Sequence, residues 1–504
     1  MLTYTNALKY LKHNWFKSIG YSIFAFYILF HLLTLGISPL PWFDETFMAS
    51  ITDSLQAENT YHIKYAPFLQ ESEFLIYGPV YFLLQKLLLQ VIGFGIYQFR
   101  LLNFIAGLCF IWLIYNFVKN HVSKATVLFI IIAILNEPVF ARSLHSGRMD
   151  FVALFFLLLS YISYFLIDSP LRYKSILSVV TGALLALAML TTPRIFFGFF
   201  FFVFQFFLHI NNRKKMVKHF TIAFSFLVCY SIWVCTKFSS FSSFINIYLN
   251  NELVKEHLGA DGLNFIRYKY HYIVWLVLLF SVLVLFLNRK NIHQQAKIIL
   301  SIVIINIIAF HIAIAERGPY AALITPFYFI VIGFALDALI LQYKKIKWRL
   351  IFYVVIVLPF ALIFFIKLIA ITISYSDRRE GSVANEIARM IPANSNVIGT
   401  FDYYYLLHKN KIAFEEMEYY TNLEKMHTYQ TTIFKYKFVI IRDNFTDSEV
   451  AKYYFAHHQH KLVAIIGNNR KLSSFEIKLD EILNHYFDSR LLSSYSGRIY
   501  QRID

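Results

Sequence analysis

Residues 151–167 read FVALFFLLLSYISYFLI and contain no charged side chain. Two further runs, Tyr21–Leu35 and Tyr353–Ile373, are almost as apolar and carry at most one charge each. A helix needs about 20 apolar residues to cross the hydrocarbon layer of a bilayer, so runs of this length predict transmembrane helices. The sequence therefore predicts an all-α polytopic membrane protein.

The overall composition supports a membrane protein. Hydrophobic residues make up 58% of the 504 residues and charged residues only 15%, whereas a soluble domain carries about 25% charge. The formal net charge of +17 does not indicate nucleic acid, because Lys and Arg gather in short loops, as the positive-inside rule requires. Cys109, Cys229 and Cys235 all lie inside apolar runs, so neither a disulfide framework nor a zinc site is expected.

The positions of the basic loops predict the topology. The first apolar run follows Lys9, Lys12 and Lys17 and lacks a cleavage pattern after it, which indicates an uncleaved signal anchor with a cytoplasmic N-terminus. The run Val80–Phe94 is short and polar enough to be an amphipathic helix along the outer interface. About eleven spans remain. They are expected near 18–37, 100–118, 124–140, 150–167, 175–191, 195–210, 219–236, 270–288, 298–315, 319–341 and 350–374.

The tail differs from the rest of the chain. An odd number of spans places residues 377–504 outside the membrane, after a transmembrane domain of residues 1–376. Its composition is mixed and polar, with a helical stretch at Ser382–Met390 and short β-type runs. The runs are Asn396–Thr400, Phe438–Arg442, Leu462–Gly467 and Ser473–Lys478. Strands that alternate with helices predict a small extracytoplasmic α/β domain.

Ionisable residues gather in the loops predicted to lie outside. Polar groups at membrane depth are costly, so they are functional candidates. Asp44-Glu45 follows the first span, and Tyr77 precedes the interfacial helix. The other candidates in these loops are Arg142, His145, Arg148, Asp150, Arg194, Arg267, Glu316 and Arg317. Outer loops usually lack Lys and Arg, so five arginines there indicate an anionic ligand such as a phosphate, which the planar guanidinium fork suits.

Each of these features also has a plain structural explanation. Asp44-Glu45 is, in an arbitrary membrane protein, most often the solvated end of a helix. Arg148 and Asp150 could form a structural ion pair at the mouth of a span. A single histidine such as His145 is more often a polar loop residue than a base. Tyr77 fits the aromatic belt at the membrane interface.

The order of the motifs resembles a known family. Asp44-Glu45 is followed by Tyr-Gly-Pro-Val-Tyr at 77–81, by Arg100-Leu-Leu-Asn-Phe, and by Ala141-Arg-x5-Arg-Met-Asp at 141–150. Thr191-Thr-Pro-Arg and Glu316-Arg-Gly-Pro-Tyr complete the series. Over roughly residues 15–345, the chain resembles the GT-C-fold glycosyltransferases that include protein O-mannosyltransferases and the aminoarabinose transferase of lipid A.

The resemblance implies a reaction. In that family an acidic residue of the first outer loop is essential, and the donor is a sugar on a polyprenyl phosphate. Asp44 is then the expected base toward an acceptor hydroxyl or amine, with inversion, and Glu45 orients the acceptor or Asp44. The expected phosphate-binding residues are Arg142, Arg148, Arg194, Arg267 and Arg317, and the other substrate contacts are Tyr77, His145, Asp150 and Glu316.

The cofactor, the acceptor and rival functions stay open at this stage. Ile76-Tyr77 stands where the aminoarabinose branch has an acidic–basic pair, so a divalent metal is possible but not required. The acceptor could be a glycan, a lipid or a protein, and the location is the bacterial inner membrane. A flippase or transporter, a polysaccharide ligase or polymerase, and a scaffold are the alternatives. Charges at span ends without an evident repeat favour the transferase over a transporter.

Overall fold

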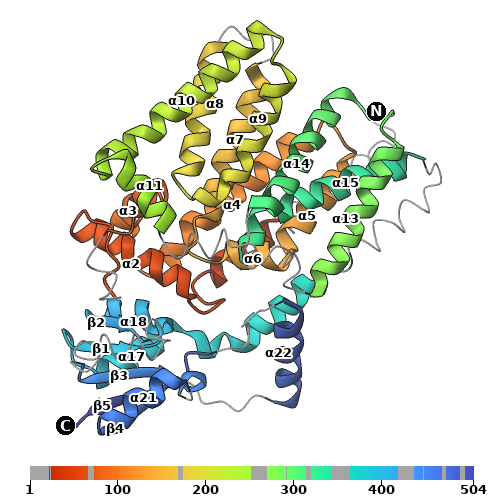
Figure 1. The fold of residues 1–504 in the computed structure, drawn as a ribbon. Coiled ribbons are helices and arrows are strands. Elements are labelled where there is room, and N and C mark those ends of the chain that lie inside the picture. Colours follow the sequence, from red (N-terminus) through yellow and green to blue (C-terminus); the bar gives the residue numbers. More distant parts are fainter. Residues whose placement is uncertain are drawn as a thin grey trace, which may run out of the picture.

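The computed structural model describes most of the chain. The described residues are 22, 24–65, 73–167, 174–250, 269–290, 292–313, 319–342, 358, 362–417, 436–446, 448–467, 473–487 and 494–503. Helices dominate, and a small sheet lies near the C-terminus (Figure 1). The expected fold class, a helical membrane protein with a small C-terminal α/β part, is confirmed.

Four described helices are long and apolar enough to cross a membrane, and they are α4, α7, α10 and α14. The bent pair α5 and α6 could form a fifth span. Further described helices are α2, α3, α8, α9, α11, α13 and α15. The bounds are α2 (Phe43–Ala57), α3 (Val80–Ile92), α4 (Ile96–Val118), α5 (Lys124–Asn136), α6 (Pro138–Leu144), α7 (Asp150–Ile167), α8 (Lys174–Met189), η2 (Pro193–Gly198), α9 (Phe199–Leu208), α10 (Arg213–Lys237), α11 (Phe241–Asn250), α13 (Lys269–Leu287), α14 (Gln294–Ala313), η3 (Pro319–Leu323) and α15 (Thr325–Gln342).

Within the described residues, the spans expected from sequence correspond to helices, and one of them is broken. The described parts of the first and last expected spans include the apolar helices Phe24–Thr34 and Leu362–Ser374. The run expected at 124–140 bends by 67° between α5 and α6. Pro138 is the first residue of α6 and cannot continue the hydrogen bonds of α5, and the Glu137 side chain caps α6 through the Phe140 N–H at 2.6 Å. The number of crossings stays a prediction.

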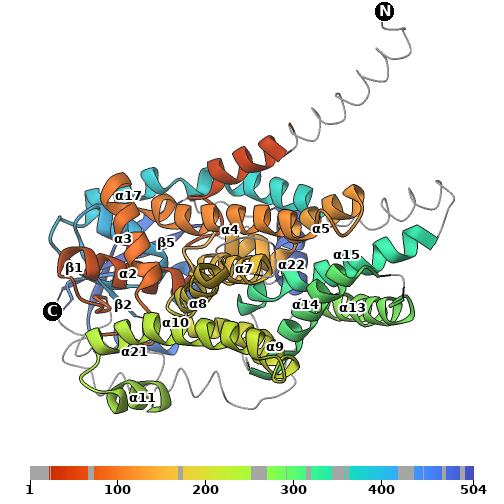
Figure 2. The same ribbon diagram turned by 90° about the horizontal axis from the view of Figure 1, so that it is seen from above.

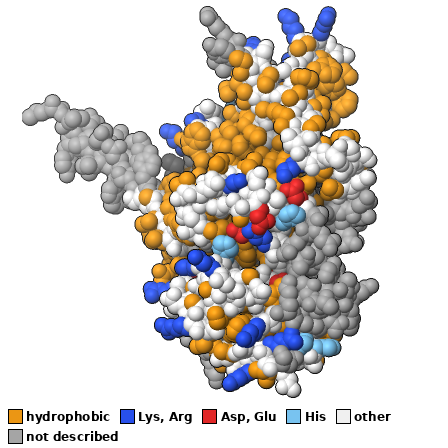
Figure 3. Space-filling view, turned by 90° about the vertical axis from the view of Figure 1, so that its left-hand side faces the viewer, with side chains coloured by type: hydrophobic (Ala, Val, Ile, Leu, Met, Phe, Trp, Pro, Cys, Tyr) orange, Lys and Arg blue, Asp and Glu red, His pale blue; other side chains and the backbone are white. Residues whose placement is uncertain are grey.

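Helix α7 forms the centre of the helical part. It packs between α4 and α8, and α10 covers α8 (Figure 2). The apolar window of α7 is 67% buried, whereas that of α10 is 28% buried. A helix that is apolar all round is buried by its neighbours or by lipid, so α10 has the composition of a lipid-facing helix. Figure 3 shows the apolar surface of the helical part. Lys and Arg side chains lie at its end away from the sheet, and a group of acidic and basic side chains lies halfway along the molecule.

The C-terminal region folds around a five-stranded sheet in the order β2-β1-β3-β5-β4. Strands β1, β2 and β3 are parallel, and β5 pairs antiparallel with β3 and β4, with Ile440 opposite Ile499. Its core includes Val397, Ile440 and Ile499. The elements are η4 (Ser376–Arg378), α17 (Glu380–Met390), β1 (Asn396–Gly399), η5 (Phe401–Tyr403), α18 (Tyr404–Lys409), β2 (Ala413–Glu416), β3 (Phe438–Arg442), η7 (Asp443–Phe445), α21 (Glu449–His457), β4 (His460–Ile466), α22 (Ser474–Phe487) and β5 (Gly497–Arg502).

The sequence predicted three of these strands correctly and one wrongly. The runs beginning at Asn396, Phe438 and Leu462 lie in β1, β3 and β4, and the predicted helix at Ser382–Met390 lies in α17. Ser473–Lys478 is not a strand, because it begins α22. Ser473 and Glu476 exchange side-chain-to-backbone hydrogen bonds of 2.7 and 3.3 Å, which is a capping box and starts a helix.

Candidate active site

A carboxylate–arginine–carboxylate chain lies where the helical part meets the loops. Asp44 stands in the first turn of α2, and Asp150 begins α7. Arg148 connects them: its Nη1 donates to Asp44 Oδ2, and its Nε donates to Asp150 Oδ2 at 2.6 Å. The side chain of Asp44 is 30% exposed, that of Arg148 5% and that of Asp150 0%. Asp44 is therefore the member of this chain that a substrate can reach.

Aromatic rings surround the arginines of this region. The guanidinium carbon of Arg148 lies 4.9 Å from the centroids of both Trp42 and Tyr320. The guanidinium carbon of Arg194 lies 3.7 Å from the Tyr320 centroid and 5.3 Å from the Tyr77 centroid. Such contacts hold a cation by its attraction to the ring face and leave the edge of the guanidinium plane for hydrogen bonds, as those from Arg148 to Asp44 and Asp150 show.

A third arginine belongs to the same group. The guanidinium carbon of Arg142 lies 5.0 Å from the centroid of the Trp42 ring, on which Arg148 also rests. Among the described residues, the cluster therefore contains three arginines, Arg142, Arg148 and Arg194, and two carboxylates, Asp44 and Asp150. Guanidinium groups of this kind suit an anionic ligand.

Burial and these charges affect the ionisation of the site. Burial alone would lower the pKa of Arg148, but Asp150 and Asp44 outweigh it and raise that pKa well above its usual value. Burial raises the pKa of Tyr77 even though Arg194 opposes the shift. At neutral pH the site therefore contains a charged Arg148 and a protonated Tyr77 phenol that can donate a hydrogen bond.

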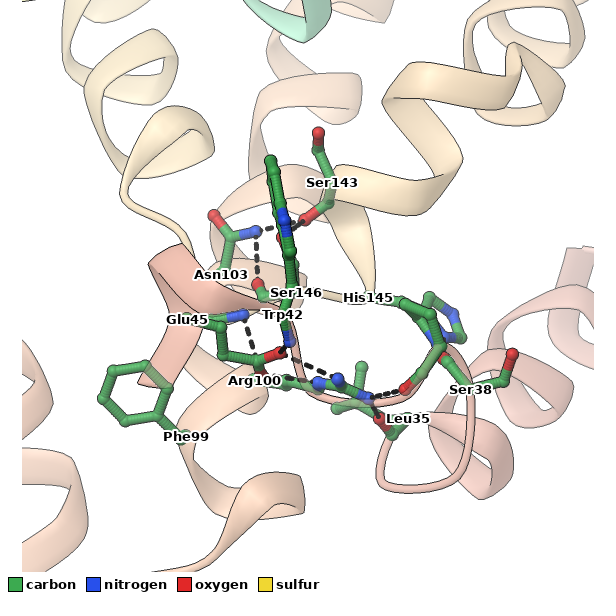
Figure 4. A network of polar contacts seen from close by, with 12 residues as sticks. Leu35, Ser38, Trp42, Glu45, Phe99, Arg100, Asn103, Ser143, His145 and Ser146 are labelled. Carbon is green, nitrogen blue, oxygen red and sulfur yellow. Dashed lines mark hydrogen bonds and ion pairs between the residues drawn. The ribbon is translucent and has the colours of Figure 1, made fainter. Parts of the chain in front are cut away.

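Glu45, the neighbour of Asp44, points into the protein (Figure 4). Arg100 of α4 binds it with two hydrogen bonds, Nε to Oε1 at 2.6 Å and Nη2 to Oε2 at 2.8 Å. Both side chains are 0% exposed. Arg100 Nη1 also donates to the backbone carbonyls of Leu35 and Pro39 at 2.8 and 2.9 Å. This buried pair therefore connects α4 to the loop before α2 and to the first turn of α2.

The loop that presents Arg148 is held from two sides. The Gly147 N–H donates to Glu45 Oε1 at 3.1 Å, and its carbonyl accepts from the Tyr81 hydroxyl at 2.5 Å. Asn103 Nδ2 donates to the Ser143 carbonyl at 2.6 Å. A Cβ on Gly147 would collide with the Phe99 ring, so glycine allows this close approach. Glu45 therefore follows Asp44 in the sequence and also binds Gly147, the residue before Arg148.

The backbone beside Tyr77 is held in the same close manner. A Cβ on Gly78 would overlap the backbone of Leu190, and the Val80 N–H donates to the Leu190 carbonyl at 3.2 Å. The start of α3 therefore rests against the end of α8, shortly before Arg194. This contact explains why Tyr77 and Arg194, far apart in sequence, lie together.

His145 lies apart from the charged chain. Its Nδ1 contacts the Ser38 carbonyl at 2.8 Å, and its Nε2 contacts Nδ1 of His31. Because a carbonyl only accepts, Nδ1 of His145 carries the proton and Nε2 accepts from His31. Burial lowers the pKa of His145 to about 3. The neutral ring therefore connects the first apolar helix to the loop before α2.

The α/β region contacts the helical part beside the site. The rings of Phe43 and Phe401 pack edge to face, with centroids 6.0 Å apart. Arg378 Nη1 donates to Ser38 Oγ at 3.0 Å. His408 Nε2 contacts Asp53 Oδ1 at 3.2 Å. Element η5, which follows strand β1, therefore lies next to the start of α2.

The structure assembles most of the residues singled out in the sequence. Asp44, Arg148, Asp150, Arg194 and Tyr77 form one cluster, which Arg142 joins through Trp42; His145 is in a separate network. Arg267, Glu316 and Arg317 lie outside the described residues. Sequence reasoning assigned no role to Trp42, Arg100 and Tyr320. A buried arginine inside an apolar run, as at Arg100, was the available signal.

The described residues contain no group of three or more His, Cys, Asp or Glu side chains that could hold a metal ion. Asp44 and Asp150 are both occupied by Arg148. The metal question therefore stays as the sequence left it.

Comparison with known proteins relates this site to a family. Residues 77–234 match the family model of dolichyl-phosphate-mannose-protein mannosyltransferases. This segment includes Arg100, Arg142, Arg148 and Arg194, although not Asp44. No curated protein matches the chain significantly in sequence.

Solved structures resemble the chain over almost its whole length. ArnT from Cupriavidus metallidurans bound to undecaprenyl phosphate has a TM-score of 0.62 and 12% identity, covering 95% of this chain and 98% of that one. Its apo state gives 0.56, 12%, 96% and 98%. The arabinofuranosyltransferase AftD from Mycobacteria gives 0.50 and 11%, covering 95% of this chain and 41% of that one. The chain therefore has the GT-C fold of membrane glycosyltransferases.

Proposed function

We propose that the protein is a membrane glycosyltransferase that moves a sugar from a polyprenyl phosphate to an acceptor hydroxyl or amine. The observation that carries this proposal is the partly exposed carboxylate of Asp44. The buried Arg148 orients it, and the buried Asp150 holds Arg148 in place. A reactive base needs a fixed direction and access to the substrate, and Asp44 has both.

The arginines have the complementary role. Arg194 and Arg142 are held by aromatic faces and carry the charge that a lipid phosphate requires. Tyr77, which stays protonated, is a hydrogen-bond donor beside Arg194, and the Tyr320 ring packs on the Arg194 guanidinium. ArnT was solved with undecaprenyl phosphate bound, and its similar fold supports a lipid phosphate as the donor. Arg267, Arg317 and Glu316 remain candidates for further contacts.

The proposed reaction is a single displacement. The acceptor oxygen or nitrogen attacks the anomeric carbon, and the bond from that carbon to the phosphate oxygen breaks. The electron pair of the broken bond stays on the phosphate, where the arginines stabilise the added charge. Asp44 takes the acceptor's proton, and the anomeric configuration inverts. A positioned base contributes about 10²–10⁴-fold to such a step.

Glu45, Asp150 and His145 have supporting roles in this proposal. Glu45 and Asp150 are fully buried and bind arginines, so they position Asp44 and Arg148 rather than meet substrate. His145 has both ring nitrogens engaged inside the protein. We therefore assign His145 to the position of the loop before α2, and not to substrate binding.

We place this chemistry on the outer face of the cytoplasmic membrane. The basic stretch Arg213–Lys218 begins α10, and this end of α10 lies away from α2 and α6 (Figure 1), which agrees with the positive-inside rule. The α/β region then lies outside and leaves the acceptor to approach from the outer side. The acceptor class, whether glycan, lipid or protein, follows from the substrate test below.

The test uses the purified full-length protein in nanodiscs with a panel of polyprenyl phosphate sugars, each combined in turn with a glycan, a lipid and a protein acceptor. We expect one donor to be consumed, and Asp44→Asn to lower that rate by about 10²–10⁴-fold. Glu58→Gln, an exposed carboxylate at the end of the same helix, is the matched control and should keep the wild-type rate. The base assignment fails if Asp44→Asn stays within a few-fold of wild type. The proposal itself fails if monodisperse protein consumes no donor.

A further inference from the structure

The connection between strands β4 and β5 leaves the sheet. These two strands are antiparallel neighbours, and a hairpin loop of about two to five residues would join them. Instead the chain departs at Gly467, which has a positive φ of 74° and donates its N–H to Glu386 at 2.9 Å. It returns only at β5, and α22 lies on the way. Figure 1 shows α22 set apart from the sheet, below α13.

Helix α22 reaches back to the apolar helices. Leu479 packs against Ala370 of the helix Leu362–Ser374, and Ile366 and Ile373 belong to the same small apolar cluster. Helix α22 also contacts α13. Helix α22 therefore contacts both α13 and the helix Leu362–Ser374. This contact is separate from the one that the sheet region makes with α2.

The face of α22 that carries Leu479 is apolar beyond this contact. Phe475 and Ile482 lie one turn before and one turn after Leu479, so the three share one face. Phe475 is 66% exposed and Ile482 is 49% exposed. Leu479 alone does not account for two large apolar side chains left at the surface of the same stripe.

We propose that this face of α22 inserts into the surface of the membrane leaflet on the side of the sheet. The helices that α22 touches are lipid-facing at this place: Phe365 and Ile369 are exposed beside Ala370, and Tyr272 and Ile273 are exposed at the start of α13. Lipid that covers these residues would then also reach Phe475 and Ile482, because α22 contacts both helices. Burial of apolar area in the headgroup–acyl boundary is the force that holds interfacial helices.

The charges of α22 fit zwitterionic or neutral lipid. Glu476, Asp480 and Glu481 exceed the single Lys478 on the helix. Anionic lipids attract basic helices, so an acidic helix gains nothing from them. Insertion therefore depends on the apolar stripe and not on the anionic content of the membrane.

Photocrosslinking in nanodiscs tests this contact on the full-length protein. Benzoylphenylalanine replaces Phe475 or Ile482, and mass spectrometry identifies what each ring captures in phosphatidylcholine nanodiscs. Ile477 is the matched control, because it is also exposed and apolar but lies on the opposite side of α22. We expect lipid adducts at Phe475 and Ile482 and a much lower yield of lipid adducts at Ile477. The yield at Phe475 and Ile482 should not rise when anionic lipid is added.

Three results would overturn the proposal. Covalent dimers at Phe475 would assign the face to a second copy of the chain. Equal lipid capture at Ile477 would show a helix that is merely near the bilayer. Absence of lipid adducts at both stripe positions, in protein whose elution profile matches wild type, would place the face in water.

Discussion

Replacing Glu45 by glutamine tests the buried pair that holds the site together. The carboxylate of Glu45 accepts hydrogen bonds from Arg100 Nε, Arg100 Nη2 and the Gly147 N–H. Glutamine keeps the shape of the side chain but removes the charge and turns one acceptor into a donor. The charge of Arg100, which is 0% exposed, is then left without its partner.

The expected loss follows from the burial of both groups. Removing one partner of a buried ion pair costs about 3–5 kcal/mol, because the remaining charge stays desolvated. Arg100→Met removes the other partner and also strips donors from the carbonyls of Leu35 and Pro39, each worth about 1–3 kcal/mol when left unsatisfied. The double variant has no stranded charge, so it should lose less than the sum of the two single variants, by about 1–3 kcal/mol.

Thermal unfolding of the four proteins in one detergent measures this cycle, with Glu58→Gln as the exposed control. We expect Glu45→Gln to melt well below the control and the double variant to recover part of the difference. Sugar transfer should fall in both single variants, since Asp44 and Arg148 lose their common support. Additive losses within about 0.5 kcal/mol, or a Glu45→Gln protein that melts with the control, would refute the reasoning.

Gly147→Ala should lower stability and transfer because its methyl group enters a packed ring, whereas Gly381→Ala, with open space around its Cβ, should melt like wild type; equal melting of the two would contradict this. His145 has a pKa lowered from 6.5 to about 3 by burial, so the unfolded chain binds the extra proton, and stability should fall as pH drops below 6.5, by up to about 1.4 kcal/mol per unit; His145→Asn should flatten that slope in acid melting curves, and an unchanged slope would count against it. Arg194→Lys keeps the charge but loses the planar contact with Tyr320, so steady-state kinetics should show a raised donor KM with little change in kcat; an unchanged KM would exclude Arg194 from donor binding.

Much of the helical architecture could be predicted from sequence, because lipid imposes a simple rule on length and polarity. α7 and α4 begin close to where their apolar runs begin. The bend after Asn136 could be suspected from Pro138 but not measured, since its angle depends on the packing of α6. Strand β5 has few apolar residues, and its place between β3 and β4 comes from long-range pairing that no local pattern contains.

Most members of the site could be predicted from the sequence, but their individual roles could be predicted less well. The charges of the outer loops and the order of the motifs singled out Asp44, Arg148 and Arg194. That Glu45 faces Arg100 while Asp44 stays half open depends on which side of the first turn of α2 meets α4, and adjacent residues in a sequence do not reveal this. Trp42 and Tyr320 were missed because aromatic residues are so common in this chain that one more carries no signal.

The outermost strands of the sheet affect how the protein avoids aggregation. Strand β2 is at one edge, and its Glu416 N–H donates to the Tyr65 carbonyl at 2.9 Å, in a loop of the helical part. Strand β4 is at the other edge and has a register irregularity at Leu462–Ala464. Open strand edges invite pairing with other chains, and covering or bulging them prevents it. A fragment that begins at residue 377 would lack the loop of Tyr65 and would expose the β2 edge. We expect such fragments to associate with one another through β2.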